Sequence, residues 1–168
     1  GNEPFAVLLP DELTIDTPSC IGQLVQAHEK TGGSVVAVME VPREQTKSYG
    51  IAAVRNESGN LSEITGMVEK PKPEEAPSNL ALIGRYVLLP EVFDHLDRHE
   101  AGAGGEIQLT DAMARMLGQS PFHALRYAGQ RYDCGSRLGF LEANVAVALH
   151  RPDTSADTRA LLARMLKG

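Results

Sequence analysis

A carboxylate side chain follows a short apolar run near the start of the chain. Residues Phe5–Leu9 read FAVLL, and Pro10 and Asp11 come next. A continuous apolar run is typical of a strand buried on both faces of an α/β sheet, and ligands bind at the carboxyl edge of such sheets. Asp11 could therefore hold Mg²⁺, which prefers hard oxygen ligands. The alternative is that Asp11 and Glu12 only begin a loop or cap a turn.

A second pair of charged side chains ends another apolar segment. Residues Gly66–Pro71 read GMVEKP, and the proline favours an extended backbone at Lys70. Glu69 could accept hydrogen bonds from sugar hydroxyls, and Lys70 could place a compact positive charge on a phosphate. The alternative is an exposed loop that carries two adjacent opposite charges.

Two further positions could complete such a site. Gly50 precedes a strand, where it would let a ligand approach the backbone closely or would simply be a turn glycine. Asp133 lies in the segment Tyr132–Ser136, which reads YDCGS. Asp133 could supply a second carboxylate to the metal of Asp11, or it could belong to a loop in which Ser136 caps a helix.

Weaker signals occur in the middle of the chain. The segment Gly102–Gly105 resembles a phosphate-binding loop in composition but lacks the GKS or GKT of a P-loop. We expect instead a flexible loop, with Glu106 stabilising the dipole of the helix that follows. His95 and His99 are spaced to share one helix face, but with no third ligand we expect an exposed pair rather than a metal site.

The elements that must position these residues alternate between strands and helices. Thr17 as N-cap, Pro18 in the first turn, and Gly32 and Gly33 as the stop predict a helix between the run Phe5–Leu9 and the apolar strand Ser34–Val41. Strand, helix and strand in this order predict a parallel pair. The remaining segments predict a hairpin over 51–68, a proline-rich loop at 69–77, a strand over 79–89, helices over 90–99 and from 106, a strand over 122–127, and helices over 136–149 and 158–167. We therefore predict an α/β fold with a mixed, mainly parallel sheet flanked by helices.

Composition narrows the classes of function. The chain has 168 residues, 42% of them hydrophobic and 23% charged, which suits a folded domain. Its net charge of −6 disfavours non-specific binding to nucleic acids, and no apolar run is long enough for a membrane span. Cys20 and Cys134 form no CxxC motif, so we expect free thiols in a cytoplasmic protein. No neighbouring residue that would activate the Cys134 thiol as a nucleophile is evident.

Taken in order, six segments resemble one family, the bacterial UTP–glucose-1-phosphate uridylyltransferases, also called UDP-glucose pyrophosphorylases. The segments are LLPDE at 8–12, TGGSVVAVMEVP at 31–42, KSYGI at 47–51, GMVEKPKPEEAPSNLALIGRY at 66–86, GAGGEIQLTDA at 102–112 and RYDCGSRLG at 131–139. The glycine-rich GxGTR loop that opens the family has no match. The resemblance therefore implies an N-terminally truncated, Rossmann-like nucleotide-diphospho-sugar transferase fold. It implies that residues 1–150 are the sugar-phosphate and metal-binding part and that 151–168 are a linker and a helix.

The resemblance also implies an activity and residue roles. The reaction would convert UTP and glucose 1-phosphate to UDP-glucose and pyrophosphate, by Mg²⁺-dependent in-line attack on the α-phosphorus. Asp11 and Lys70 would be catalytic, Asp11 and Asp133 would bind the metal, and Gly50, Glu69 and Lys70 would bind the substrate. The carboxylate next to Asp11 is Glu12 here, where the family commonly has a second aspartate. The chain alone is expected to be inactive.

Other interpretations stay open at this stage. A thymidylyltransferase or another sugar-nucleotide transferase would share the same sugar half, and a noncatalytic sugar-nucleotide-binding or oligomerisation module would need no chemistry. The resemblance favours a homo-oligomer. An apolar stripe near the C-terminus could pack on a second subunit or on its own domain; its residues are Leu161, Leu162, Met165 and Leu166.

Overall fold

The computed structural model describes residues 2–15, 17–101 and 105–167. The chain divides into two compact units, one made of Gly1–Leu9 and Pro18–Ala128 and the other of Pro10–Thr17 and Gly129–Gly168. We call them unit 1 and unit 2 and describe each by itself. The predicted division between residues 150 and 151 stays a prediction.

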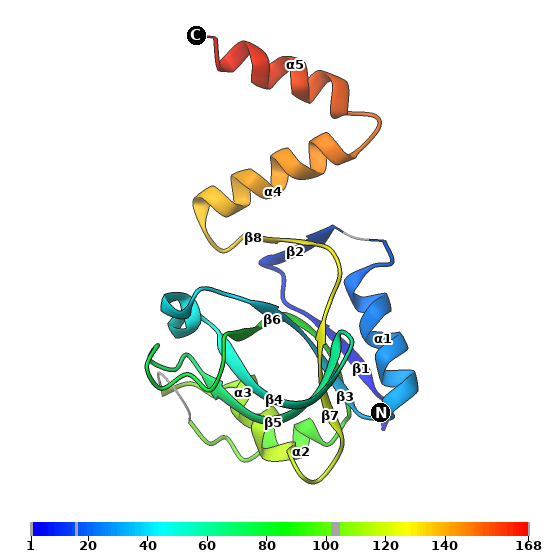
Figure 1. Ribbon diagram of the computed structural model, residues 1–168, viewed down its shortest axis with the longest axis vertical. Helices are drawn as coiled ribbons and strands as arrows, with labels where there is room; N and C mark the ends of the chain where they lie inside the picture. The colour runs from blue at the N-terminus through cyan, green and yellow to red at the C-terminus, as the bar shows by residue number, and fades with distance from the viewer. Residues whose placement is uncertain (1, 16, 102–104, 168) are drawn as a thin grey trace. The chain divides into compact units, whose positions relative to one another are not determined.

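Unit 1 contains a six-stranded sheet in the order β1-β6-β3-β7-β5-β4, with β4 also pairing with β6 (Figure 1). Among these strands β3 and β7 pair in parallel, whereas the other pairs are antiparallel. The prediction of a mixed sheet is confirmed, but the prediction of a mainly parallel one is wrong. The strands are β1 (Phe5–Leu8), β3 (Ser34–Glu40), β4 (Gly50–Ser58), β5 (Leu61–Glu69), β6 (Leu80–Leu88) and β7 (Phe122–Arg126).

Three of the antiparallel pairs arise because β6 lies inside the sheet, where it pairs with β1, β3 and β4. All nine residues of β6 are buried. A strand this apolar is stabilised when neighbouring strands on both sides remove it from water. β6 separates β1 from β3, which run in the same direction but do not pair as predicted. β1 lies at the edge of the described sheet, and its residues alternate between half-buried and exposed. The predicted full burial of Phe5–Leu9 is therefore wrong.

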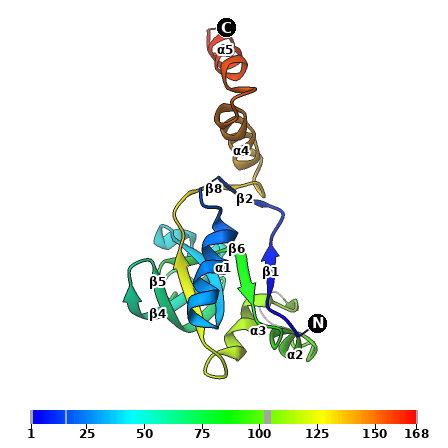
Figure 2. The same cartoon turned by 90° about the vertical axis from the view of Figure 1, so that its right-hand side faces the viewer.

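Helices cover both faces of this sheet (Figures 1 and 2). Helix α1 (Cys20–Thr31) packs Cys20, Leu24 and Ala27 against β3 and β6 on one face. Helices α2 (Val92–Leu96) and α3 (Leu109–Met116) pack against the core cluster of the other face. A short 3₁₀ helix, η1 (Arg43–Ser48), follows β3.

Helix α1 ends where the sequence predicts but begins at a different N-cap residue. Its N-cap is Ser19, whose Oγ accepts a hydrogen bond from the Gly22 N–H at 3.2 Å, instead of Thr17. Both residue types suit an N-cap, and local pattern alone does not choose between positions two residues apart. The helix ends as predicted at Gly32, whose φ of 68° is in the left-handed region.

Unit 2 combines a two-stranded ribbon with two helices. Strands β2 (Glu12–Ile15) and β8 (Gln130–Asp133) pair antiparallel and were not predicted, because four residues each are too short to show a period. Helix α4 (Arg137–His150) begins as predicted with Ser136, whose Oγ accepts from the Gly139 N–H at 3.1 Å. Helix α5 (Ser155–Met165) follows it. Over the described residues, we find no helix with the length and apolar character needed to cross a bilayer.

Candidate functional site

The ribbon of unit 2 brings together two of the predicted metal ligands. The Asp11 carbonyl accepts a hydrogen bond from the Cys134 N–H at 2.7 Å, which continues the β2–β8 pairing by one residue. Asp133 Oδ1 accepts from the Gly135 N–H at 2.9 Å. A Cβ atom placed on Gly135 would lie 3.1 Å from Asp133 Oδ1 and 3.5 Å from Asp11 Oδ2. Both carboxylates therefore face the space that Gly135 leaves open.

This pair of carboxylates fits a magnesium ion. Mg²⁺ takes oxygen ligands and is commonly held by one or two carboxylates together with substrate phosphates and water. Over residues 2–15, 17–101 and 105–167 no group of three or more His, Cys, Asp or Glu side chains could hold a metal. A two-carboxylate site that needs phosphates to complete it is compatible with that finding. The structure thus places Asp11 and Asp133 as predicted, while their metal role stays a prediction.

The neighbouring carboxylate, Glu12, has a different partner. Its Oε2 accepts from Arg131 Nε at 2.5 Å, and its Oε1 accepts from Arg131 Nη2. The side chains of Glu12 and Arg131 are only 11% and 10% exposed, and they meet diagonally across the β2–β8 ribbon, in which Glu12 pairs with Asp133 and Arg131 with Thr14. A bidentate pair of this kind occupies both carboxylate oxygens. Glu12 therefore holds the ribbon together beside Asp11.

Glu69 ends strand β5 in unit 1, and Lys70 follows it directly. Lys70 Nζ lies 3.7 Å from Glu69 Oε1, and the side chains are 54% and 10% exposed respectively. A nearly buried carboxylate thus lies next to a cation that solvent and ligands can reach. This arrangement could accept sugar hydroxyls at Glu69 and neutralise a phosphate at Lys70.

The backbone of Lys70 contradicts the sequence prediction. Its φ is 46°, in the left-handed region, whereas the following Pro71 predicted an extended residue. The Lys70 N–H donates to the Tyr49 carbonyl at 3.0 Å, one step beyond the paired residues Gly50 and Glu69. This tertiary hydrogen bond overrides the local preference. A left-handed residue other than glycine costs about 1–2 kcal/mol, and such strain is concentrated at functional sites.

Gly50 leaves room for the Glu69 carboxylate because it has no side chain. A Cβ on Gly50 would lie 3.0 Å from Glu69 Oε2 and 2.9 Å from Thr110 Oγ1. Glu69 and Thr110 therefore occupy the space above Gly50, and Thr110 is buried in the first turn of α3. The sequence prediction assigned that space to a ligand. Thr110 was missed as a member of the site, although it lies within the QLTD portion of a quoted segment.

The structure bears differently on the glycine-rich loop, on Glu106 and on the two histidines. Gly102, Ala103 and Gly104 lie outside the described residues. Glu106 precedes Gln108, the N-cap of α3, so its predicted place at the helix start is wrong. His95 is buried in α2, which contradicts the expected exposed pair with His99. Its imidazole packs inward because Val92 and His95 form the buried face of that short helix.

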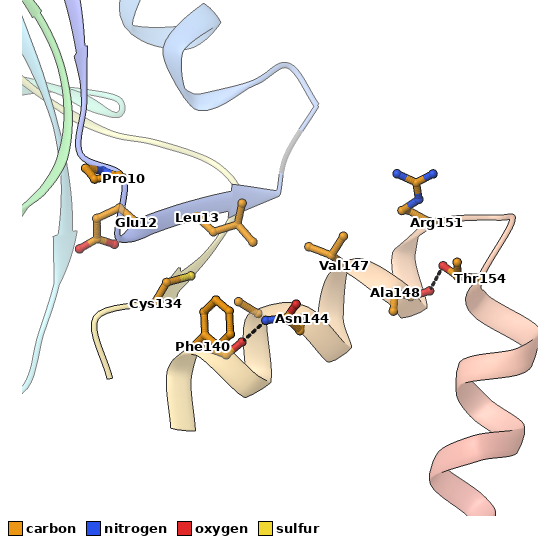
Figure 3. A pocket seen from close by; sticks show the side chains of 11 residues that line it. Pro10, Glu12, Leu13, Cys134, Phe140, Asn144, Val147, Ala148, Arg151 and Thr154 are labelled. Atoms are coloured by element: carbon orange, nitrogen blue, oxygen red, sulfur yellow. Dashed lines mark hydrogen bonds between the residues drawn. The ribbon is translucent and has the colours of Figure 1, made fainter. Parts of the chain in front are cut away.

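A groove of about 410 Å³ lies within unit 2 (Figure 3). Its polar side chains are largely engaged: Asn144 Nδ2 donates to the Phe140 carbonyl at 2.7 Å, and Thr154 Oγ1 donates to the Ala148 carbonyl at 2.7 Å. The lining is otherwise mainly apolar and includes Leu13, Cys134, Ala143 and Val147. The groove presents few free polar groups that could recognise a sugar phosphate.

Comparison with known proteins shows the family of this chain. The sequence profile of the nucleotidyl transferase family matches residues 1–149. This chain belongs to the nucleotidyl transferase family. The resemblance recognised from the sequence is thereby confirmed at the level of the family.

Relatives of this nucleotidyl transferase carry a more specific name. A UTP–glucose-1-phosphate uridylyltransferase of Komagataeibacter xylinus is 59% identical over 138 residues, which are 82% of this chain and 49% of the relative. One of Staphylococcus epidermidis is 46% identical over 165 residues, 98% of this chain and 57% of the relative. The chain therefore spans about half the length of the curated relatives it matches.

Solved structures give the same picture of the fold. A UDP-glucose pyrophosphorylase complexed with UDP-glucose matches 90% of this nucleotidyl transferase chain with a TM-score of 0.85 and 43% identity, over 58% of its own length. A UTP-bound enzyme from Acinetobacter baumannii matches 96% with a TM-score of 0.84 and 34% identity, over 56% of its own length. The predicted α/β transferase fold is confirmed.

Proposed function

We propose that the protein containing this chain forms UDP-glucose and pyrophosphate from UTP and glucose 1-phosphate. The observation that carries the proposal is the pairing of a nearly buried carboxylate, Glu69, with the exposed and strained Lys70. A sugar phosphate offers hydroxyl donors for the first and a negative charge for the second. The names of the relatives support this substrate class.

In the proposed reaction, an oxygen of the sugar phosphate attacks the α-phosphorus of UTP in line. A new P–O bond forms, the bond between the α- and β-phosphates breaks, and pyrophosphate leaves with the electron pair. Proteins accelerate such transfers mainly by positioning and by neutralising charge. Glu69 orients the sugar, and Lys70 neutralises the phosphate as it approaches.

Magnesium is the cofactor that we propose for this reaction. Asp11 and Asp133 would hold it, because their carboxylates face the same open space at Gly135. When bound, Mg²⁺ supplies positive charge that offsets the phosphates of the nucleotide. Glu12 is assigned no metal role because both of its oxygens bind Arg131.

The first experiment is pyrophosphorolysis by the complete gene product with Mg²⁺. UDP-glucose, dTDP-glucose and ADP-glucose are compared at equal concentration. UTP formed mainly from UDP-glucose supports the proposal. A stronger signal from another nucleotide would reassign the base, and a folded protein without turnover would favour a noncatalytic binding module.

The role of Lys70 has its own test. Lys70→Ala removes a charge that acts on the transferring phosphate, so the rate should fall by about 10²–10³. Lys72→Ala is the matched control, since Lys72 lies in the same loop, is exposed and forms a surface ion pair with Glu75. Turnover of Lys70→Ala within twofold of the parent would exclude the role.

A homo-oligomer is proposed from the exposed stripe of α5. No residue of α5 is buried, and Leu161, Met165 and Leu166 are exposed large apolar side chains. An isolated helix of this length is marginal in water, so a covering partner would stabilise it. Met165→Asp should shift the mass measured by light scattering toward the monomer. An unchanged mass would exclude this contact.

A cytoplasmic location is also proposed. Cys20 and Cys134 are both free thiols in the structure, which suits a reducing compartment. Fractionation of cells followed by immunodetection tests the location.

A further inference from the structure

A loop between β5 and β6 carries Lys70 at its first position. We call residues 70–79 the β5–β6 loop, and it lies entirely within unit 1. Residues 71–79 form neither helix nor strand, yet Pro71 and Ala76 are buried, so the loop packs against the rest of the unit. Because Lys70 stands at the start of this loop, the contacts that fix the loop also limit where its ammonium group can reach.

The 3₁₀ helix η1 binds the far end of the β5–β6 loop through its first residue, Arg43. Arg43 Nη2 donates to the Ala76 carbonyl at 2.6 Å, and Arg43 Nη1 donates to the Ser78 carbonyl at 3.1 Å. These partners lie 33 and 35 residues from Arg43 along the chain. One planar guanidinium thus holds two carbonyls of the loop at once, in a fixed geometry that an ammonium group does not provide.

The same 3₁₀ helix binds the near end of the loop. Its C-cap is Tyr49, whose carbonyl accepts from the Lys70 N–H at 3.0 Å. Thr46, which is fully buried, joins the two ends of η1. Its Oγ1 donates to the Arg43 carbonyl at 2.8 Å, and its carbonyl accepts from the Tyr49 N–H at 3.2 Å. Both ends of the loop are therefore tied to one short helix that is itself held together by hydrogen bonds.

A tight turn connects the two ends of the loop. The Lys72 carbonyl accepts from the Glu75 N–H at 2.9 Å and from the Ala76 N–H at 3.0 Å. Between this turn and Lys70 stands only Pro71, whose ring fixes its φ. Little backbone freedom is left between Lys70 and Ala76, so a restraint on Ala76 also acts on Lys70.

The contribution of Arg43 is greatest at Ala76, because Ser78 has a second anchor. Ser78 Oγ donates to the Ala52 carbonyl on β4 at 2.5 Å and accepts from the Leu80 N–H at 2.9 Å. Loss of the Arg43 side chain would therefore leave the Ser78 end in place. It would release the turn that leads back to Lys70.

Lys70 needs such a restraint because its backbone is strained. Its φ of 46° is left-handed, although the proline that follows favours an extended residue. A strained backbone persists only where the surrounding structure holds it. We propose that Arg43 is a positioning residue that keeps Lys70 in this conformation by fixing the turn at Ala76. The inference rests on the proposed function, in which Lys70 neutralises the sugar phosphate, and Arg43 acts through Lys70 without a contact of its own to the substrate.

The experiment is a double-mutant cycle in the complete gene product. Misplacement by about 1 Å can cost about 10²-fold in rate, and the released turn should shift by less, so Arg43→Ala should lower kcat about tenfold. In a Lys70→Ala background, Arg43→Ala should change kcat by less than about twofold, since effects of residues that act through one another are not additive. A residue that only stabilises the fold would lower kcat equally in both backgrounds.

Lys47→Ala is the matched control. Lys47 is exposed on the same 3₁₀ helix, so its loss removes one positive charge from η1 without touching the β5–β6 loop carbonyls. Its kcat should stay within about twofold of the parent. Arg43→Lys keeps the charge but loses the planar fork, so its kcat should lie between those of Arg43→Ala and the parent. Arg43→Lys enters the cycle in place of Arg43→Ala if the alanine variant does not fold.

Hydrogen exchange of the Lys70 amide gives a readout that needs no turnover. This amide donates to the Tyr49 carbonyl, so its exchange reports whether Lys70 keeps its place. Exchange should be about tenfold faster in Arg43→Ala and unchanged in Lys47→Ala.

Two results would overturn the proposal. One is a Lys70 amide that exchanges in Arg43→Ala as it does in the parent. The other is an equal loss of kcat in the Lys70→Ala background, which would assign Arg43 to general stability. If the parent shows no pyrophosphorolysis, or if Lys70→Ala keeps full turnover, the proposed function or the role of Lys70 fails. The exchange of the Lys70 amide then still decides whether Arg43 holds Lys70.

Discussion

Replacing Gly50 by alanine is a direct test of how the Glu69 carboxylate is held. The added Cβ would lie 2.9 Å from Thr110 Oγ1, 3.0 Å from Glu69 Oε2 and 3.2 Å from Thr110 Cγ2. Ordinary contacts of a Cβ begin near 3.4 Å. The two side chains must therefore retreat by about 0.5 Å, or the strand must shift. The carboxylate is the far end of a long, flexible side chain, so we expect Glu69 to move more than Thr110.

The size of the effect follows from that displacement. A misplacement of about 1 Å can cost about 10²-fold in rate, so a shift of about 0.5 Å is expected to lower kcat/KM for glucose 1-phosphate about tenfold. Overpacking should also destabilise the fold by about 1–3 kcal/mol. The assay is UDP-glucose formation at varied glucose 1-phosphate and saturating UTP. Thermal unfolding is measured in parallel.

A glycine in the same hairpin provides the control. A Cβ on Gly66 would lie 3.6 Å from the Ala53 Cβ, which is an ordinary contact. Gly66→Ala should therefore leave kcat/KM within twofold. Adding Thr110→Ala to Gly50→Ala should recover part of the loss, because it removes two of the three close contacts. Activity of Gly50→Ala within twofold of the parent would refute the reasoning.

Two other predictions concern stability. Glu12→Gln removes the negative charge that binds Arg131 at a site about one-tenth exposed, so unit 2 should lose about 3 kcal/mol. Hydrogen exchange of the β8 amides measures this loss, and a change below about 1 kcal/mol would contradict it. Burial lowers the pKa of His123 from its ordinary value of 6.5, and the charge of Glu63 opposes that shift. The His123 Nδ1 has no hydrogen-bond partner among the described groups. The unfolded chain then binds more protons, so stability should fall as the pH drops below about 6.5. Denaturant unfolding of His123→Gln between pH 5 and 7.5 should depend less on pH, and an unchanged dependence would contradict this.

Local signals in the sequence determined most of the elements. Gly32 ends α1 and Ser136 begins α4 because a left-handed C-cap and a hydroxyl N-cap act on neighbouring backbone groups. The hairpin of β4 and β5 follows from two apolar runs joined by a turn at residues 59–60. Glu69 and Lys70 were identified as a carboxylate and a cation at the end of a strand, and Glu69 is the last residue of β5 with Lys70 directly after it. Interactions within a few residues were sufficient for each of these predictions.

Tertiary structure alone decided which distant residues meet. Glu12 pairs with Arg131 across 119 positions, and Gln23 binds Ala128 across 105. Neither pairing leaves a pattern in the local sequence, because strand register and helix docking bring the partners together. The left-handed Lys70 is the clearest case, since its hydrogen bond to the Tyr49 carbonyl outweighs the preference set by the next residue. The sequence by itself thus determined the elements and the chemistry available at their ends, whereas long-range contacts decided how each functional side chain is held.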